Sequence, residues 1–85
     1  SGNILTDNDC IEIDSVDVPF HIEVRKKNNE YILTIIPKVD VKLSSNGKVF
    51  DCRSNDERIV YSGLKQGLYD IETPLTSKKI TIRLK

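Results

Sequence analysis

Hydrophobic and polar residues alternate along most of this chain with the two-residue period of a β-strand. From Phe20 to Arg25, apolar positions 20, 22 and 24 alternate with polar ones, so one row faces a core and the other faces solvent. Residues 31–36 are apolar at nearly every position, which indicates a central strand. Because Asn28 and Asn29 tolerate the backbone of a turn, residues 20–36 are predicted to form a β-hairpin. Pro19, which cannot donate a ladder hydrogen bond, suits the start of an edge strand.

A second hairpin is predicted around Asn46-Gly47, a dipeptide typical of two-residue hairpin turns. Residues 39–43 alternate before this turn, and residues 48–52 form the returning strand after it. A polar loop at residues 53–58 then leads to another strand that begins at Ile59.

Residues 61–72 are predicted to form the corner around which the rest of the chain is arranged. Gly67 adopts positive φ angles more readily than residues with a side chain, so it suits the turn between two strands. Leu64 is expected to fill the core beside this turn, and Tyr69 to begin an inward-facing row on the second strand. A last strand follows at residues 79–84.

The N-terminal residues 4–9 are polar and predict a turn, whereas residues 10–14 alternate and predict a short strand. About seven to eight short strands without a helical stretch predict an all-β fold, an antiparallel Ig-like or prealbumin-like β-sandwich. We expect residues 4–85 to form one domain. Residues 1–3 are expected to be a tag remnant or a disordered start.

Composition favours a β-sheet fold, and the charge pattern argues against two classes of partner. The chain has no Ala, the best helix former, and 18 β-branched Ile and Val residues, which favours sheet. Its 13 basic and 13 acidic residues are interspersed, without the basic stripe typical of proteins that bind nucleic acid or anionic membranes, so neither partner is expected. A small-molecule site usually needs a concave face with exposed aromatic residues. At least Phe20, Phe50 and Tyr69 of the five aromatic residues are needed for the core, so no small-molecule substrate is expected.

No group of residues predicts catalysis, a metal site or a cofactor. His21, the only histidine, shares a strand face with Glu23, an arrangement more typical of a solvated surface than of an active site. Residues 7–9 supply oxygen ligands but lack the Gly and distal Glu of a calcium loop. Cys10 and Cys52 match no zinc spacing, and both a disulfide and two free thiols remain open.

The segment from Gly63 to Ile71 follows the pattern Gly-Leu-x-x-Gly-x-Tyr-x-Ile. It resembles the corner of prealbumin-like β-sandwiches, which include carboxypeptidase regulatory-like domains and the Cna-B repeats of surface adhesins. The likeness covers about residues 38–85 and implies a β-sandwich module. Many Cna-B repeats carry a Lys–Asn isopeptide bond assisted by a Glu. Here Thr73 stands at the position of that Glu, and the last strand has no Asn, so no crosslink is expected.

These observations predict a non-catalytic structural or protein-interaction module, one domain of a larger surface, secreted or virion protein. Its partner is expected to be another protein or a neighbouring domain, and a surface or virion location is slightly favoured over the cytoplasm. The alternative is a complete small intracellular or phage-encoded regulator that binds and blocks a host protein. The predicted contact residues lie in the polar loop and at the corner: Arg53, Asp56, Glu57, Arg58, Lys65 and Gln66.

Overall fold

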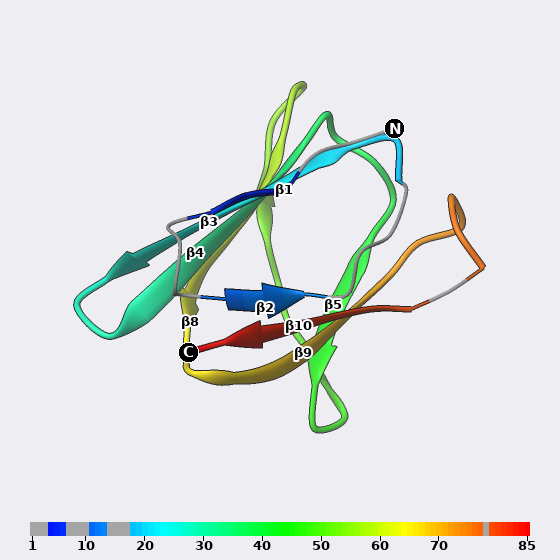
Figure 1. Ribbon diagram of the computed structural model, residues 1–85. Helices are drawn as coiled ribbons and strands as arrows, with labels where there is room; N and C mark the ends of the chain where they lie inside the picture. Colours follow the sequence, from blue (N-terminus) through cyan, green and yellow to red (C-terminus); the bar gives the residue numbers. More distant parts are fainter. Residues whose placement is uncertain (1–3, 7–10, 14–17, 78) are drawn as a thin grey trace.

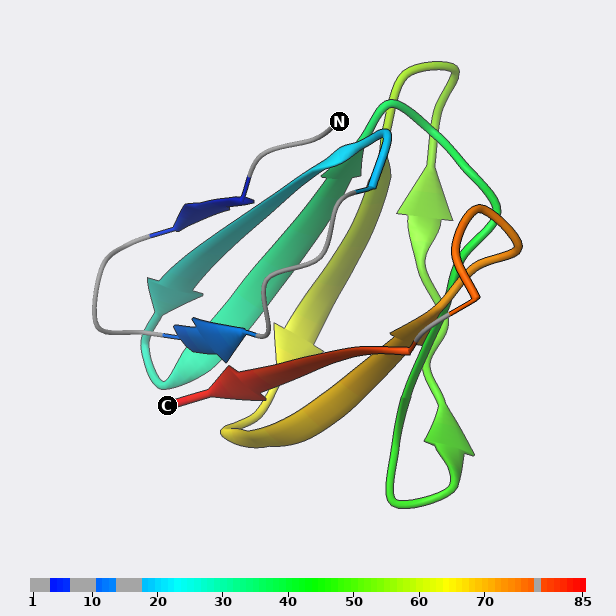
Figure 2. The same cartoon turned by 45° about the vertical axis from the view of Figure 1, so that its right-hand side comes forward.

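Ten strands form two facing sheets in the computed structural model, which describes residues 4–6, 11–13, 18–77 and 79–85. One sheet has the strand order β1-β3-β4-β8-β7 and the other has the order β2-β10-β9-β5-β6 (Figures 1 and 2). The predicted all-β class and sandwich architecture are confirmed. The ten strands exceed the seven to eight that the sequence predicts.

The strands of the first sheet are β1 (Ile4–Thr6), β3 (His21–Lys27), β4 (Glu30–Ile36), β8 (Ile59–Leu64) and β7 (Arg53–Ser54). Those of the second sheet are β2 (Ile11–Ile13), β10 (Ile80–Leu84), β9 (Gly67–Glu72), β5 (Lys42–Ser45) and β6 (Lys48–Val49). Neighbouring strands are antiparallel, except that β1 runs parallel to β3.

Both predicted hairpins are present. Asn28 and Asn29 join β3 to β4 with φ angles of 51° and 65°, and Asn46 and Gly47 join β5 to β6 with φ angles of 51° and 79°. Positive φ at both central residues is the type I′ geometry that matches the twist of the flanking strands. Strand β4 lies third of five in its sheet, as its apolar sequence predicts.

Predictions for two regions were wrong, and the strand predicted at residues 39–43 begins only at Lys42. Residues 4–6 form strand β1 rather than a turn, and because β1 pairs with β3, β3 is not an edge strand despite the preceding Pro19. The rest of that predicted turn lies outside the described residues. The returning strand at residues 48–52 ends at Val49, since the chain then crosses to the other sheet and residues 53–54 pair with β8 as β7. Both errors concern pairing with distant strands, which local residue chemistry does not encode.

The core lies between the two sheets and consists of the inward-facing rows that the alternation predicts. The partly buried ring of Phe50 packs against this core. The buried hydrophobic residues of the core are Val18, Phe20, Ile22, Val24, Tyr31, Leu33, Ile35, Leu43, Ile59, Tyr61, Leu64, Tyr69, Ile71, Ile80, Ile82 and Leu84. Among the described residues, no buried side-chain nitrogen or oxygen lacks a hydrogen-bond partner, so the core is both apolar and satisfied.

Candidate interaction surfaces

The structure separates the predicted contact residues into two surfaces at opposite ends of β8 (Figure 1). Arg53, Asp56, Glu57 and Arg58 belong to the β7–β8 hairpin, before the first residue of β8. Lys65 and Gln66 follow its last residue. At about 3.3 Å per residue, the six-residue strand holds the two surfaces roughly 20 Å apart, so one small ligand cannot contact both.

The tip of the β7–β8 hairpin is held by the side chain and backbone of Asn55. Its Oδ1 atom accepts hydrogen bonds from the backbone N–H groups of Glu57 at 2.7 Å and Arg58 at 2.9 Å, and its own N–H donates to the Arg58 carbonyl at 3.1 Å. The side chains of Asp56, Glu57 and Arg58 are exposed, and none of them forms an ion pair within the described part of the chain. The loop thus combines a fixed backbone with unpaired charges.

The β8–β9 corner joins the two sheets. Ile32 of β4 lies opposite both Ser62 and Gly63, so β8 contains a β-bulge, and Gly63 in this bulge has a positive φ of 69°. The bulge bends the strand toward the other sheet and leaves Leu64 buried, as the sequence predicts. Gly67 also has a positive φ, 153°, at the first residue of β9.

Tyr69 closes this corner with its hydroxyl group. The hydroxyl donates a hydrogen bond to the carbonyl of Lys65 at 2.7 Å and accepts one from the N–H of the same residue at 3.0 Å. The Lys65 ammonium points outward and pairs with Glu30 at 2.7 Å, which links the corner to the β3–β4 turn.

A groove of about 470 Å³ lies between the β5–β6 hairpin and this corner. The Lys48 ammonium lies 4.8 Å from the centroid of the Phe50 ring, and that ring lies 5.5 Å from the ring of Tyr69. The residues that line the groove are Ser45, Asn46, Lys48, Phe50, Gly63, Lys65, Gln66 and Tyr69. Sequence reasoning missed Lys48 and Phe50 as surface candidates. The one available signal was the Asn46-Gly47 turn, which brings Lys48 back beside β5.

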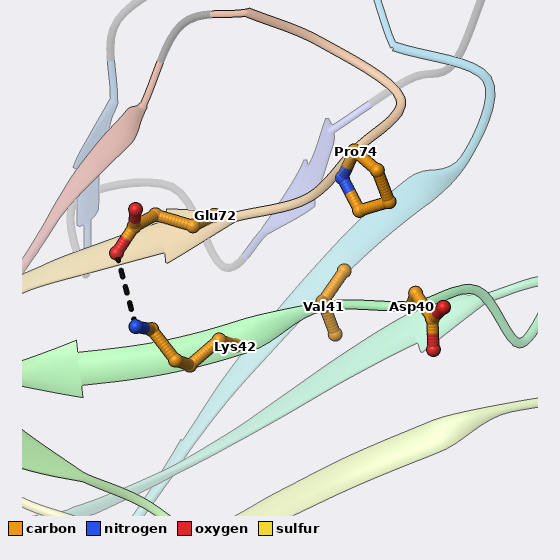
Figure 3. A pocket seen from close by; sticks show the side chains of 5 residues that line it. All are labelled: Asp40, Val41, Lys42, Glu72 and Pro74. Atoms are coloured by element: carbon orange, nitrogen blue, oxygen red, sulfur yellow. Dashed lines mark ion pairs between the residues drawn. The ribbon is translucent and has the colours of Figure 1, made fainter.

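A second, smaller depression of about 270 Å³ lies where β5 begins and β9 ends (Figure 3). Lys42 and Glu72 face each other across neighbouring strands, with 3.6 Å between their charged groups. Asp40, Val41 and Pro74 complete its lining. The lysine of this depression is paired with Glu72, whereas Lys48 in the groove forms no ion pair with any described residue, so the groove offers more to an anionic ligand.

The remaining sequence candidates are the His21–Glu23 pair, the two cysteines and residues 7–9. His21 and Glu23 share the outward face of β3, and Glu23 lies 4.0 Å from Arg25. Cys52 is an exposed free cysteine, whereas Cys10 and residues 7–9 lie outside the described residues. Within the described ranges, no three His, Cys, Asp or Glu residues are grouped as a metal site would require. The part of the chain that the structure describes also contains no helix long and apolar enough to cross a membrane.

Tyr61 is the one described residue with a clearly shifted pKa. Burial of its phenol and the nearby Cys52 thiol together raise its pKa to about 12, against a lowering by a hydrogen bond with the backbone of Leu43. Its side chain extends from β8 into the core, where it is 2% exposed. The shift therefore reflects the burial of Tyr61 in the core between the two sheets.

Comparisons of the chain with known protein families, with curated proteins and with solved structures found no match.

Proposed function

We propose that this chain is a non-catalytic β-sandwich module that binds another protein through the β7–β8 hairpin. The supporting observation is the hairpin tip, whose backbone is held by Asn55 while Asp56, Glu57 and Arg58 present unpaired charges to solvent. A loop that is already ordered loses less conformational entropy on binding, and loops on a rigid scaffold commonly carry recognition.

The strand order supports an Ig-like type of sandwich. The order β3-β4-β8-β7 facing β10-β9-β5 follows the Ig constant-type order A-B-E-D facing G-F-C. The hydroxyl of Tyr69 bonds to the backbone of Lys65 at the start of β9, as in the tyrosine corner of such domains. The sequence resemblance to prealbumin-like modules points to a related class. We propose that the module is one domain of a larger surface, secreted or virion protein.

Site-specific photo-crosslinking tests the binding surface. A photoreactive amino acid at position 56 is expected to trap a partner of defined mass in extracts of the source cells. The same group at exposed Arg25, on the outer face of the first sheet, serves as the matched control and should not trap it. The double variant Glu57→Lys/Arg58→Glu should reduce the yield roughly tenfold, the effect of losing about 1.4 kcal/mol of binding. Equal adducts from both positions, or none from position 56, would contradict the proposal.

The exposed thiol of Cys52 favours the second candidate, a small intracellular regulator that binds a host protein. Free surface thiols persist in reducing compartments and become oxidised outside them. The intact mass of protein purified without reductant distinguishes the two settings. Two alkylatable thiols support the intracellular candidate, whereas a mass lower by two hydrogens that reduction restores supports the secreted or surface one.

A further inference from the structure

Four lysines gather at one end of the sandwich although they lie far apart in the sequence. They come from the end of β3, from β6 and from the β8–β9 corner. The turn that follows β3, the β5–β6 hairpin and this corner lie in the lower half of Figure 2. We call this group, Lys26, Lys27, Lys48 and Lys65, the lysine end. All four are exposed. Glu30 is the only acidic residue within 26–31, 44–50 and 62–69, and it pairs with Lys65.

The three segments of the lysine end, residues 26–31, 44–50 and 62–69, contain four of the 13 basic residues of the chain and one of its 13 acidic residues. A concentrated positive surface attracts anionic partners and raises their rate of association.

The groove at the lysine end also offers groups that a peptide requires. Lys48 and Lys65 line it and supply positive charge, and Lys48 forms no ion pair with any described residue. The Phe50 ring supplies an apolar wall. The exposed side-chain amides of Asn46 and Gln66 can each donate to a peptide carbonyl and accept from a peptide N–H.

We propose that this groove binds an acidic segment of a partner protein, with carboxylates against Lys48 and Lys65 and an apolar side chain against Phe50. The inference rests on the proposed function as a protein-binding module, but it assigns a surface at the opposite end of β8 from the β7–β8 hairpin. A short peptide fits the groove better than a nucleic acid does. Glu30, paired with Lys65, interrupts the positive surface that a continuous phosphate backbone would follow.

Selection from a library of random twelve-residue peptides tests which side chains the groove prefers, without assuming the sequence of the partner. The full chain is expected to enrich peptides that combine several Asp or Glu residues with an aromatic or aliphatic one. Fluorescence anisotropy of a labelled enriched peptide should show weaker binding as salt increases. The variant Lys48→Glu/Lys65→Glu should weaken binding at least roughly tenfold. The matched control Lys38→Glu/Lys79→Glu changes the net charge equally at the far end of the sandwich and should leave binding unchanged.

Several results would overturn the inference: no enriched peptide, enrichment without acidic residues, or equal weakening by the two double variants. Tighter binding of a twelve-nucleotide oligothymidine or of phosphatidylserine vesicles than of the peptide would also overturn it. The milder variant Lys48→Gln/Lys65→Gln removes the same charges without placing a carboxylate beside Glu30, and its circular dichroism should match that of the unaltered chain. If the variant keeps its fold and loses peptide binding while the crosslink at position 56 persists, the two surfaces are independent and the inference stands. If the crosslink at position 56 forms while no acidic peptide binds the unaltered chain, the inference fails and the proposed function stands.

Discussion

The hydroxyl group of Tyr69 holds the backbone at the point where the chain passes from one sheet to the other. It makes two hydrogen bonds to Lys65, in a partly buried position. Tyr69→Phe keeps the ring but removes both bonds, and each such bond contributes about 1 kcal/mol to stability. We expect a loss of about 2 kcal/mol in the free energy of unfolding, measured by urea denaturation.

Ser45→Ala is the matched comparison for this variant. It removes a single hydrogen bond from the Ser45 hydroxyl to the carbonyl of Leu68, which is exposed to solvent. Water replaces an exposed partner at little cost, so we expect a loss below about 0.5 kcal/mol. A loss as large as that of Tyr69→Phe would mean that the corner has no special role.

The raised pKa of Tyr61 predicts a loss of stability at alkaline pH. Its usual pKa is 10.0, and in the folded chain the pKa is about 12. Between these values the unfolded chain releases the phenol proton while the folded chain retains it, so the free energy of unfolding falls as pH rises. The contribution is fully present below pH 10 and is lost toward pH 12. Melting temperatures measured from pH 9 to pH 12 should therefore fall.

Tyr61→Phe isolates this contribution from that of other titrating groups. Phenylalanine has no proton to lose, so the melting temperature of the variant should fall less steeply above pH 10 than that of the unaltered chain. Parallel curves for the two proteins would show that Tyr61 titrates with its usual pKa.

At the scale of the strand, the bulge in β8 depends on Gly63. A side chain at this position would meet no other atom within 4 Å, so the φ of 69° is the constraint rather than space. Ala in this left-handed conformation costs about 1–2 kcal/mol. We expect Gly63→Ala to reduce the free energy of unfolding by that amount, and Gly63→Asn to reduce it less although Asn is larger, because Asn tolerates positive φ. Chemical denaturation of both variants measures the difference, and a larger loss for Asn would indicate crowding instead.

The sequence predicts the strands that are joined by turns with characteristic residues. Asn28 and Asn29, and then Asn46 with Gly47, define two hairpins from residues that favour positive φ. The switch of sheets between β6 and β7 has no such marker, since residues 50–52 contain no Gly, Pro or Asn. Strand β1 was missed because its pairing with β3 joins residues 18 positions apart.

At the scale of the whole molecule, the sequence provides candidate contact residues but does not show which of them lie close together in space. Arg53 to Arg58 and Lys65 to Gln66 are close in sequence, yet β8 carries them to opposite ends of the sandwich. Conversely, Lys26, Lys48 and Lys65 are distant in sequence and share one end. The order of charges along the chain does not predict this surface, because sheet topology brings the lysines together.

The strand order also has a consequence for how the chain reaches its fold. Strands β4, β5, β8 and β9 follow one another in this order along the chain. Strand β4 pairs with β8 in one sheet, and β5 pairs with β9 in the other. The two pairings interlock, so neither sheet can be completed from one half of the chain. We expect folding in a single slow step, on the order of milliseconds to seconds as for other all-β domains, measured by stopped-flow fluorescence of the tyrosines. A peptide that ends at Asp51 should remain unfolded alone, since β4 and β5 then lack their partners.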